Sequence, residues 1–127
     1  MEVFSRNQLQ RIGESMVSAM LQEAGCTLIQ RNFRTLHAEI DIMLRFKSTL
    51  LVVEVRTLQS EQMPDLSVVF PQSKLHKVSR SMAILRRSRK EFEKLQFKAL
   101  YYLVLFNKKK KMFNIIRIPR NYFNAMV

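Results

Sequence analysis

Two strand-like segments carry acidic side chains close together in the chain. The first reads His-Ala-Glu-Ile-Asp-Ile-Met-Leu from residue 37, and the second reads Leu-Val-Val-Glu-Val-Arg-Thr from residue 51. Because side chains alternate between the two faces of a strand, Glu39 and Asp41 share a face, as do Glu54 and Arg56. Each strand therefore carries two charged side chains on one side. The other face of the first strand is predicted to carry Ile40, Ile42 and Leu44.

A tight turn at residues 47–48 would join the two segments as a hairpin. This register places Asp41 opposite Glu54 and Glu39 opposite Arg56. Directly opposed side chains have Cβ atoms roughly 4.5–5.5 Å apart, so like charges there repel. We expect an ordinary salt bridge between Glu39 and Arg56. The Asp41–Glu54 pair needs a shared proton, a neighbouring cation or a bound metal.

The opposed carboxylates suit Mg²⁺ or Mn²⁺, which prefer oxygen ligands and keep positions open for water and phosphate oxygens. An ion held by Asp41 and Glu54 would activate water and stabilise the charge that develops on a phosphodiester under attack. A second interpretation stays open, because charged residues on the polar face of a strand are common in proteins.

Positive charge is concentrated in the second half of the chain. The net charge is +12, yet residues 1–66 sum to −1 and residues 67–127 to +13. Such asymmetry indicates a polyanionic partner, either nucleic acid or anionic lipid, although lysines also keep small proteins soluble. Of these partners, DNA is the one expected. The residues predicted to bind nucleic acid lie along one face of a helix: Lys74, Lys77, Arg80, Arg87, Lys90 and Lys94.

An α/β scaffold must position these side chains. The hydrophobic pattern predicts one domain over residues 1–127, in the order α-β-β-β-α-β-β, with a mixed central sheet flanked by helices. The third apolar run is almost continuously aliphatic and is expected at the sheet centre. The predicted elements are a helix over 6–24, strands over 27–33, 38–46 and 49–56, a loop over 58–72, a helix from Ser73, and strands over 97–106 and 112–118.

The first helix has clear start and stop signals. Ser5 and Gln8 form a capping box, and Gly25 is expected to end the helix. Glu14 falls at the edge of the apolar arc, where it faces either a cleft or solvent. The arc is formed by Leu9, Ile12, Met16, Ala19 and Met20 and is widened by Val17 and Leu21.

The second helix has an apolar stripe beside its basic face. Arg89 falls inside the stripe, so either its stem packs along the core or the helix changes direction there. The stripe consists of Leu75, Val78, Met82, Leu85 and Phe92.

Four motifs occur in the same order and at the same spacing as in a known family. They are Gly-Glu at 13–14, Arg-Asn-Phe-Arg at 31–34, Glu-Ile-Asp at 39–41 and Val-Glu-Val-Arg-Thr at 53–57. This arrangement resembles the YraN-like family, a branch of the restriction-endonuclease-like fold related to archaeal Holliday-junction resolvases and other PD-(D/E)xK nucleases. The resemblance covers residues 12–95.

The resemblance implies a catalytic set of five residues. Asp41 and Glu54 would hold the divalent metal, Glu14 would lie near it from the first helix, Glu39 would belong to the same site, and Arg56 would stand at the position of the catalytic basic residue. Two positions depart from the family pattern. Ala38 replaces a glycine, and Arg56 replaces a lysine; arginine keeps the positive charge but is bulkier and does not lose its proton.

Cysteine content and apolar run length limit the location of the protein. Cys26 has no second cysteine to pair with and is expected to be a buried small hydrophobic residue in a reducing compartment. The longest uncharged apolar stretches, residues 49–53 and 99–106, are too short to span a bilayer. A cytoplasmic protein without membrane contact is expected.

Three functions fit these observations. The first is a metal-dependent nuclease-like protein acting on DNA or structured nucleic acid, weakened by arginine at position 56, and dimeric by analogy with junction-cutting relatives. The second is a nucleic-acid-binding module of the same fold without catalysis. The third is an adaptor whose basic surface binds an acidic protein.

Overall fold

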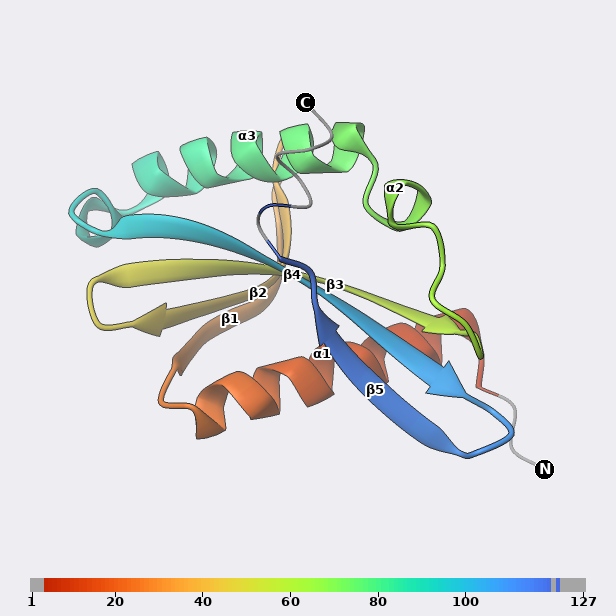
Figure 1. Ribbon diagram of the computed structural model, residues 1–127. Coiled ribbons are helices and arrows are strands. Elements are labelled where there is room, and N and C mark those ends of the chain that lie inside the picture. Colours follow the sequence, from red (N-terminus) through yellow and green to blue (C-terminus); the bar gives the residue numbers. More distant parts are fainter. Residues whose placement is uncertain (1–3, 120, 122–127) are drawn as a thin grey trace.

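The computed structural model describes residues 4–119 and 121 and shows one sheet flanked by helices (Figure 1). The rest of the predicted domain lies outside the described residues. The elements are α1 (Arg6–Glu23), β1 (Thr27–Arg34), β2 (Glu39–Phe46), β3 (Thr49–Gln59), α2 (Leu66–Val69), α3 (Gln72–Ser88), the 3₁₀ helix η1 (Lys90–Phe92), β4 (Gln96–Asn107) and β5 (Met112–Arg117).

The five strands lie in chain order, β1-β2-β3-β4-β5. β3 and β4 are parallel, and every other neighbouring pair is antiparallel. A parallel pair cannot be joined by a tight turn and needs a crossover, which the segment with α2 and α3 supplies. The predicted mixed sheet with the aliphatic third strand at its centre is confirmed. The predicted element order is also confirmed, with α2 and η1 added.

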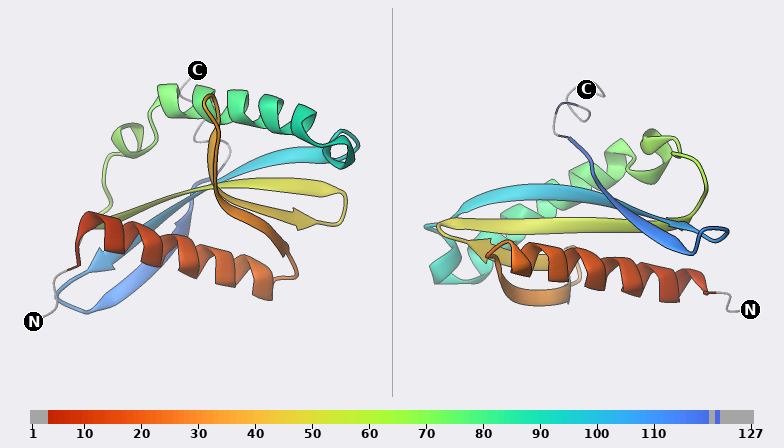
Figure 2. Two further views of the ribbon diagram at one scale, coloured as in Figure 1. Left: turned by 180° about the vertical axis from the view of Figure 1, so that it is seen from behind. Right: turned by 60° about the horizontal axis from the view of Figure 1, so that its bottom comes forward.

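The two long helices cover opposite faces of the sheet (Figures 1 and 2). Each face therefore has its own buried cluster. The α1-side core includes Val17, Leu21, Ile42, Leu44, Val53 and Val55. The α3-side core includes Ile40, Met43, Val52, Phe70, Val78, Leu85 and Leu103.

Helix α1 begins and ends as its residues predict. The hydroxyl of Ser5 accepts the Gln8 N–H at 3.1 Å, and the Gln8 side chain accepts the Ser5 N–H at 2.7 Å. At the other end, Gly25 has φ +104°, a conformation that favours glycine. Cys26 follows and is half-buried against the α1-side core, less buried than expected.

The buried face of α1 differs from the predicted arc. Ala19 is exposed, whereas Gly13, Glu14 and Ser18 are buried. The cause is a close approach of α1 to β3: a Cβ added to Gly13 would overlap the Thr57 hydroxyl and lie 3.0 Å from the Thr57 Cβ. The predicted arc considered apolar side chains alone, and it therefore missed a contact centred on a glycine.

The second long helix is shorter than predicted. Its N-cap is Pro71 rather than Ser73, and it ends at Ser88, after which Arg89 is extended with φ −139°. The chain changes direction there, and the Arg89 guanidinium lies 5.2 Å from the centre of the Phe92 ring. Lys90 belongs to η1 and Lys94 follows it, so these two lysines do not continue the basic face of α3.

The predicted 58–72 loop contains more structure than expected. Strand β3 continues to Gln59, and α2 begins after Asp65, whose carboxylate accepts the Ser67 N–H at 3.0 Å. Among residues 4–119 and 121, no helix is both long enough and apolar enough to cross a lipid bilayer.

Candidate functional site

Strands β2 and β3 pair along only part of their length. The ladder runs from Phe46–Thr49 to Ile42–Val53 in the predicted register, with the predicted turn at residues 47–48. Beyond Ile42 the alternation breaks, because Ile40 packs in the α3-side core while Ile42 packs in the α1-side core. The prediction that Ile40 shares a face with Ile42 and Leu44 is therefore wrong. Asp41 lies at this irregularity.

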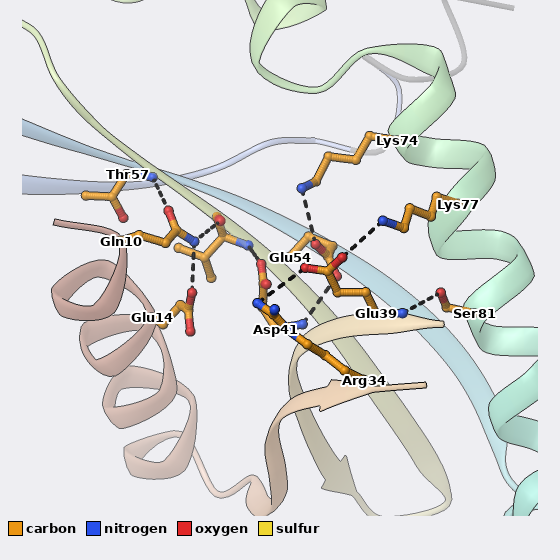
Figure 3. A network of polar contacts seen from close by, with 11 residues as sticks. Gln10, Glu14, Arg34, Glu39, Asp41, Glu54, Thr57, Lys74, Lys77 and Ser81 are labelled. Atoms are coloured by element: carbon orange, nitrogen blue, oxygen red, sulfur yellow. Dashed lines mark hydrogen bonds and ion pairs between the residues drawn. The ribbon is translucent and has the colours of Figure 1, made fainter. Parts of the chain in front are cut away.

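Where β2 separates from β3, side chains bond the backbone N–H and carbonyl groups of β3 in place of a neighbouring strand. The Val55 N–H donates to Asp41 Oδ2 at 2.9 Å. The Gln10 amide donates to the Val55 carbonyl at 2.6 Å and accepts the Thr57 N–H at 3.1 Å. Gln10 thus replaces a peptide group of a neighbouring strand, and Asp41 is held at the point of divergence (Figure 3).

Glu54 is the most deeply buried of the candidate ligands on the α3 side. Its side chain is 5% exposed, its Oε1 accepts the Asp41 N–H at 3.4 Å, and its Oε2 lies 3.6 Å from the Lys74 ammonium. Burial, followed by the neighbouring Asp41 charge, raises the pKa of Glu54 to about 8, while Lys74 opposes the rise. The Asp41–Glu54 proximity predicted from the hairpin is present, although both residues lie past the end of the ladder.

Glu14 approaches the same region from α1. Its Oε2 accepts a hydrogen bond from Gln10 at 2.9 Å, and its Oε1 lies 3.8 Å from an Arg31 nitrogen. Within the described residues that buried Oε1 has no hydrogen-bond donor. Burial is the largest cause of a raised Glu14 pKa, and the Asp41 charge adds to it. Glu14 therefore faces the interior, which resolves the two alternatives left open by its spacing.

Glu39 forms a different ion pair from the predicted one. Lys77 donates to its carboxylate at 3.0 Å and Arg34 lies 3.5 Å away. The hydrogen bond from Lys77 is the main reason that the pKa of Glu39 is lowered. The predicted Glu39–Arg56 salt bridge is wrong, because β2 leaves β3 before these residues can face each other. The Glu39 N–H instead donates to Ser81 on α3 at 3.3 Å.

Arg56 follows Glu54 on the same face of β3, and its side chain is exposed. Among residues 4–119 and 121 it forms no ion pair with the acidic residues of the site. Lys74, in the first turn of α3, is the cation that reaches Glu54 (Figure 3).

The basic residues of α3 separate into two groups. Lys74 and Lys77 contact the acidic residues, whereas Arg80 and Arg87 are exposed further along the helix. A pocket of about 470 Å³ lies between α3 and the turn joining β1 to β2, and Lys77 and Arg80 help to line it. Lys90 and Lys94 are exposed but lie beyond the end of α3.

The residues of this site lie in a chain that matches a known protein family. The model of a family described as "Uncharacterised protein family UPF0102" matches residues 13–118, which is most of the chain. The chain belongs to this family. The YraN-like resemblance predicted from the four motifs is confirmed by this match.

Individual UPF0102 proteins show similarity over shorter segments. A relative from Syntrophus aciditrophicus is 38% identical over 60 residues, covering 46% of this chain and 47% of the relative. One from Neisseria meningitidis serogroup C is 36% identical over 70 residues, covering 55% and 61%. One from Desulfosudis oleivorans is 34% identical over 76 residues, covering 60% and 62%. The matched part thus spans about half to three fifths of these UPF0102 relatives.

The two departures from the family pattern have different structural consequences. Ala38 is buried immediately before β2, and its φ is not positive, so the position does not require a glycine. Arg56 is exposed, and among the described residues it forms no ion pair with the carboxylates. The second departure keeps the positive charge but replaces an ammonium with a bulkier guanidinium.

The acidic residues fit a divalent ion held by two carboxylates. Asp41 raises the pKa of both Glu14 and Glu54, so a cation near Asp41 would relieve repulsion on two sides. Mg²⁺ is commonly bound by one or two carboxylates and keeps several water ligands. Within the described residues, no group of three or more His, Cys, Asp or Glu side chains could hold a metal, so water would complete the shell of an ion at Asp41 and Glu54.

Sequence reasoning missed two residues of this site. Gln10 lies one helical turn before Glu14, and this spacing was a usable signal for their hydrogen bond. Its contacts with β3, 45 and 47 residues away, had no such signal. Arg31 was recognised only as part of a motif, and its approach to Glu14 depends on how β1 lies beside α1.

Proposed function

We propose that this UPF0102 protein is a divalent-metal-dependent phosphodiesterase acting on DNA or structured nucleic acid. The carrying observation is the Asp41–Glu54 pair at the point where β2 leaves β3, with the basic first turns of α3 beside it. The likeness of its motifs to those of PD-(D/E)xK nucleases supports the same reaction class.

Asp41 and Glu54 would hold the Mg²⁺ or Mn²⁺ ion, which would activate water and offset charge on the phosphate. The hydrogen bond from the Val55 N–H fixes the orientation of Asp41. The half-buried position of Asp41 beside buried Glu54 limits the water around both carboxylates, which strengthens electrostatic interactions there. Arg80 and Arg87 would contact the nucleic-acid backbone along α3.

Incubation with four-way junction, single-stranded and linear duplex DNA tests this proposal, with Mg²⁺ or Mn²⁺ present. We expect metal-dependent cleavage that falls by about 100-fold or more in Asp41→Asn, because electrostatic stabilisation of a developing charge is worth this much. Glu23→Gln, an exposed carboxylate change at the end of α1, is the matched control and should cut normally. Cleavage that is equal in Asp41→Asn and wild type would contradict the assignment.

A non-catalytic nucleic-acid-binding module is the second candidate. The observation in its favour is Arg56, which replaces the family lysine and is exposed, with no ion pair to the carboxylates among the described residues. This candidate predicts salt-sensitive DNA binding without cleavage on any of the three substrates. A partner retained after nuclease treatment would instead favour the adaptor function.

A further inference from the structure

Lys74 connects the buried acidic site to the surface. It lies in the first turn of α3, where its N–H donates to the Pro71 carbonyl at 2.9 Å. Its ammonium lies 3.6 Å from Glu54, whose side chain is 5% exposed, whereas the Lys74 side chain is 30% exposed. The Lys74 amine therefore reaches a buried carboxylate from a position that solvent and ligands can also reach.

The neighbourhood of this amine has room for a further group. A small pocket of about 40 Å³ is lined by Glu39, Glu54, Lys74, Lys77 and Val78. Space of this size holds about two or three water molecules, which the oxygens of a phosphate could displace. An ammonium group has three N–H donors, so Lys74 can contact Glu54 and still donate to a phosphate oxygen.

Arg56 has neither the contact with a buried carboxylate nor the adjoining pocket that Lys74 has. It points from the same face of β3 as Glu54 but is exposed, and within the described residues it has no ion pair with Glu54 or Asp41. Its cross-strand neighbour on β4 is Leu103 of the α3-side core. Arg56 is also absent from the residues that line the small pocket beside Lys74.

We propose that Lys74, rather than Arg56, is the catalytic cation that contacts the phosphate under attack. This inference rests on the proposed phosphodiesterase function. In the reaction, water loses a proton to solvent, its oxygen forms a new bond to phosphorus, and the bond from phosphorus to one sugar oxygen breaks. The sugar oxygen keeps the electron pair and takes a proton from solvent. Lys74 stays protonated and stabilises the negative charge on a non-bridging oxygen.

A purely structural Lys74 would only neutralise Glu54. The two roles separate when the cleavage rate at saturating DNA is measured beside DNA affinity with Ca²⁺. We expect Lys74→Ala to reduce the rate by about 100-fold or more and the affinity by less than about 10-fold, because the contact strengthens as charge develops. Arg56→Ala should lower the rate by much less than Lys74→Ala does, and the control Lys108→Ala should stay within about 3-fold of the wild-type rate.

Chemical replacement guards against a folding defect in Lys74→Ala. In a Cys26→Ser background, Lys74→Cys is inactive until 2-bromoethylamine converts the cysteine to a lysine analogue. Recovery of at least about one tenth of the rate is expected, since the amine returns to nearly the same place. No recovery with an intact urea-unfolding transition would overturn the proposal, as would equal losses in Lys74→Ala and Arg56→Ala.

A readout without turnover separates failure of this inference from failure of the proposed function. Lysines are reductively methylated with ¹³C, and the Lys74 signal is identified from its loss in Lys74→Arg. DNA added with Ca²⁺ should shift that signal. If wild type cuts DNA but Lys74→Ala cuts equally well, only the Lys74 inference fails. If wild type does not cut and the signal shifts, the phosphodiesterase function fails while the phosphate contact stands. If neither occurs, both are wrong.

Discussion

Glu54 is a carboxyl group for which ionisation is costly in the folded protein. Burial and the Asp41 charge raise its pKa from 4.5 to about 8, against the pull of Lys74. The folded protein therefore holds the proton at pH values where the unfolded chain has released it. By linkage, stability falls as pH rises from about 4.5 to about 8. A metal bound by the ionised carboxylate would remove part of this penalty.

The corresponding prediction concerns Glu54→Gln, which keeps the shape of the side chain without a titrating carboxyl. In buffer with EDTA, we expect the free energy of unfolding of wild type to decrease between pH 5 and pH 8, and this decrease to be smaller in the variant. Urea unfolding at three pH values measures it. The raised pKa of Glu14 leaves a residual decrease in both proteins. Identical pH slopes would show that Glu54 is already ionised in the fold.

At the scale of elements, the contact between α1 and β3 holds the site together. Gly13 allows the close approach, and Gln10 uses that approach to bond the part of β3 that β2 has left. Asp41 bonds the same part of β3 from β2. A change in the α1–β3 distance therefore alters both the stability of the fold and the position of the candidate ligand.

Gly13→Ala is expected to destabilise the protein by about 1–2 kcal/mol. Overpacking against Thr57 costs about 1–3 kcal/mol, and the better helix propensity of alanine returns up to about 1 kcal/mol. Thr57→Ala removes the hydroxyl and methyl that meet the new Cβ. Urea unfolding of both single variants and the double variant should give a favourable coupling of at least about 1 kcal/mol. Strictly additive losses of stability would mean that the new Cβ at position 13 does not meet the Thr57 side chain, because α1 has shifted away from β3.

Gln10→Leu should lower the free energy of unfolding, although the two side chains are similar in size. It leaves the Val55 carbonyl and the Thr57 N–H without their side-chain partner, and an unsatisfied buried group costs about 1–3 kcal/mol. Gln22→Leu, in the last turn of the same helix, is the matched control because Gln22 is exposed and its side chain, within the described residues, bonds Ser18 on its own helix. Measured by urea unfolding, the free energy of unfolding should fall by about 2 kcal/mol or more in Gln10→Leu and change little in the control.

At the scale of the whole molecule, positive charge follows α3 and the turn between β4 and β5. The exposed residues of α3 lie beside the acidic site, whereas four lysines, Lys108 to Lys111, lie at the tip of the β4–β5 hairpin. Each lysine or arginine adds one positive charge, whichever of the two groups it belongs to. Under the proposed function, we expect the α3 residues rather than the hairpin lysines to hold a nucleic acid against Asp41 and Glu54.

Salt dependence of DNA binding distinguishes the two groups. Changing Lys77, Arg80 and Arg87 together to Ala should reduce the slope of log affinity against log salt by about 2–3, because each lost phosphate contact removes roughly 0.9. Changing Lys108, Lys109 and Lys110 to Ala removes the same charge and should leave the slope nearly intact. Fluorescence anisotropy at several salt concentrations measures both. Equal changes would indicate that net charge, rather than α3, controls binding.

Local signals in the sequence determined much of this protein. The capping box and Gly25 placed α1, and the two-residue turn set the register of β2 and β3. The aliphatic run predicted the central strand, and the four motifs identified the family. These features depend on residues a few positions apart, or on a motif order that is visible without coordinates.

Tertiary structure alone decided which charges meet. The register predicted a Glu39–Arg56 pair, but β2 leaves β3 at Asp41, and Glu39 pairs with Lys77 instead. Lys74 reaches Glu54 only because the crossover brings the start of α3 beside β3, and Glu14 is buried only because Gly13 rotates the buried face of α1. Such contacts join residues 20 to 44 positions apart through packing. Side-chain periodicity within one element carries no information about them.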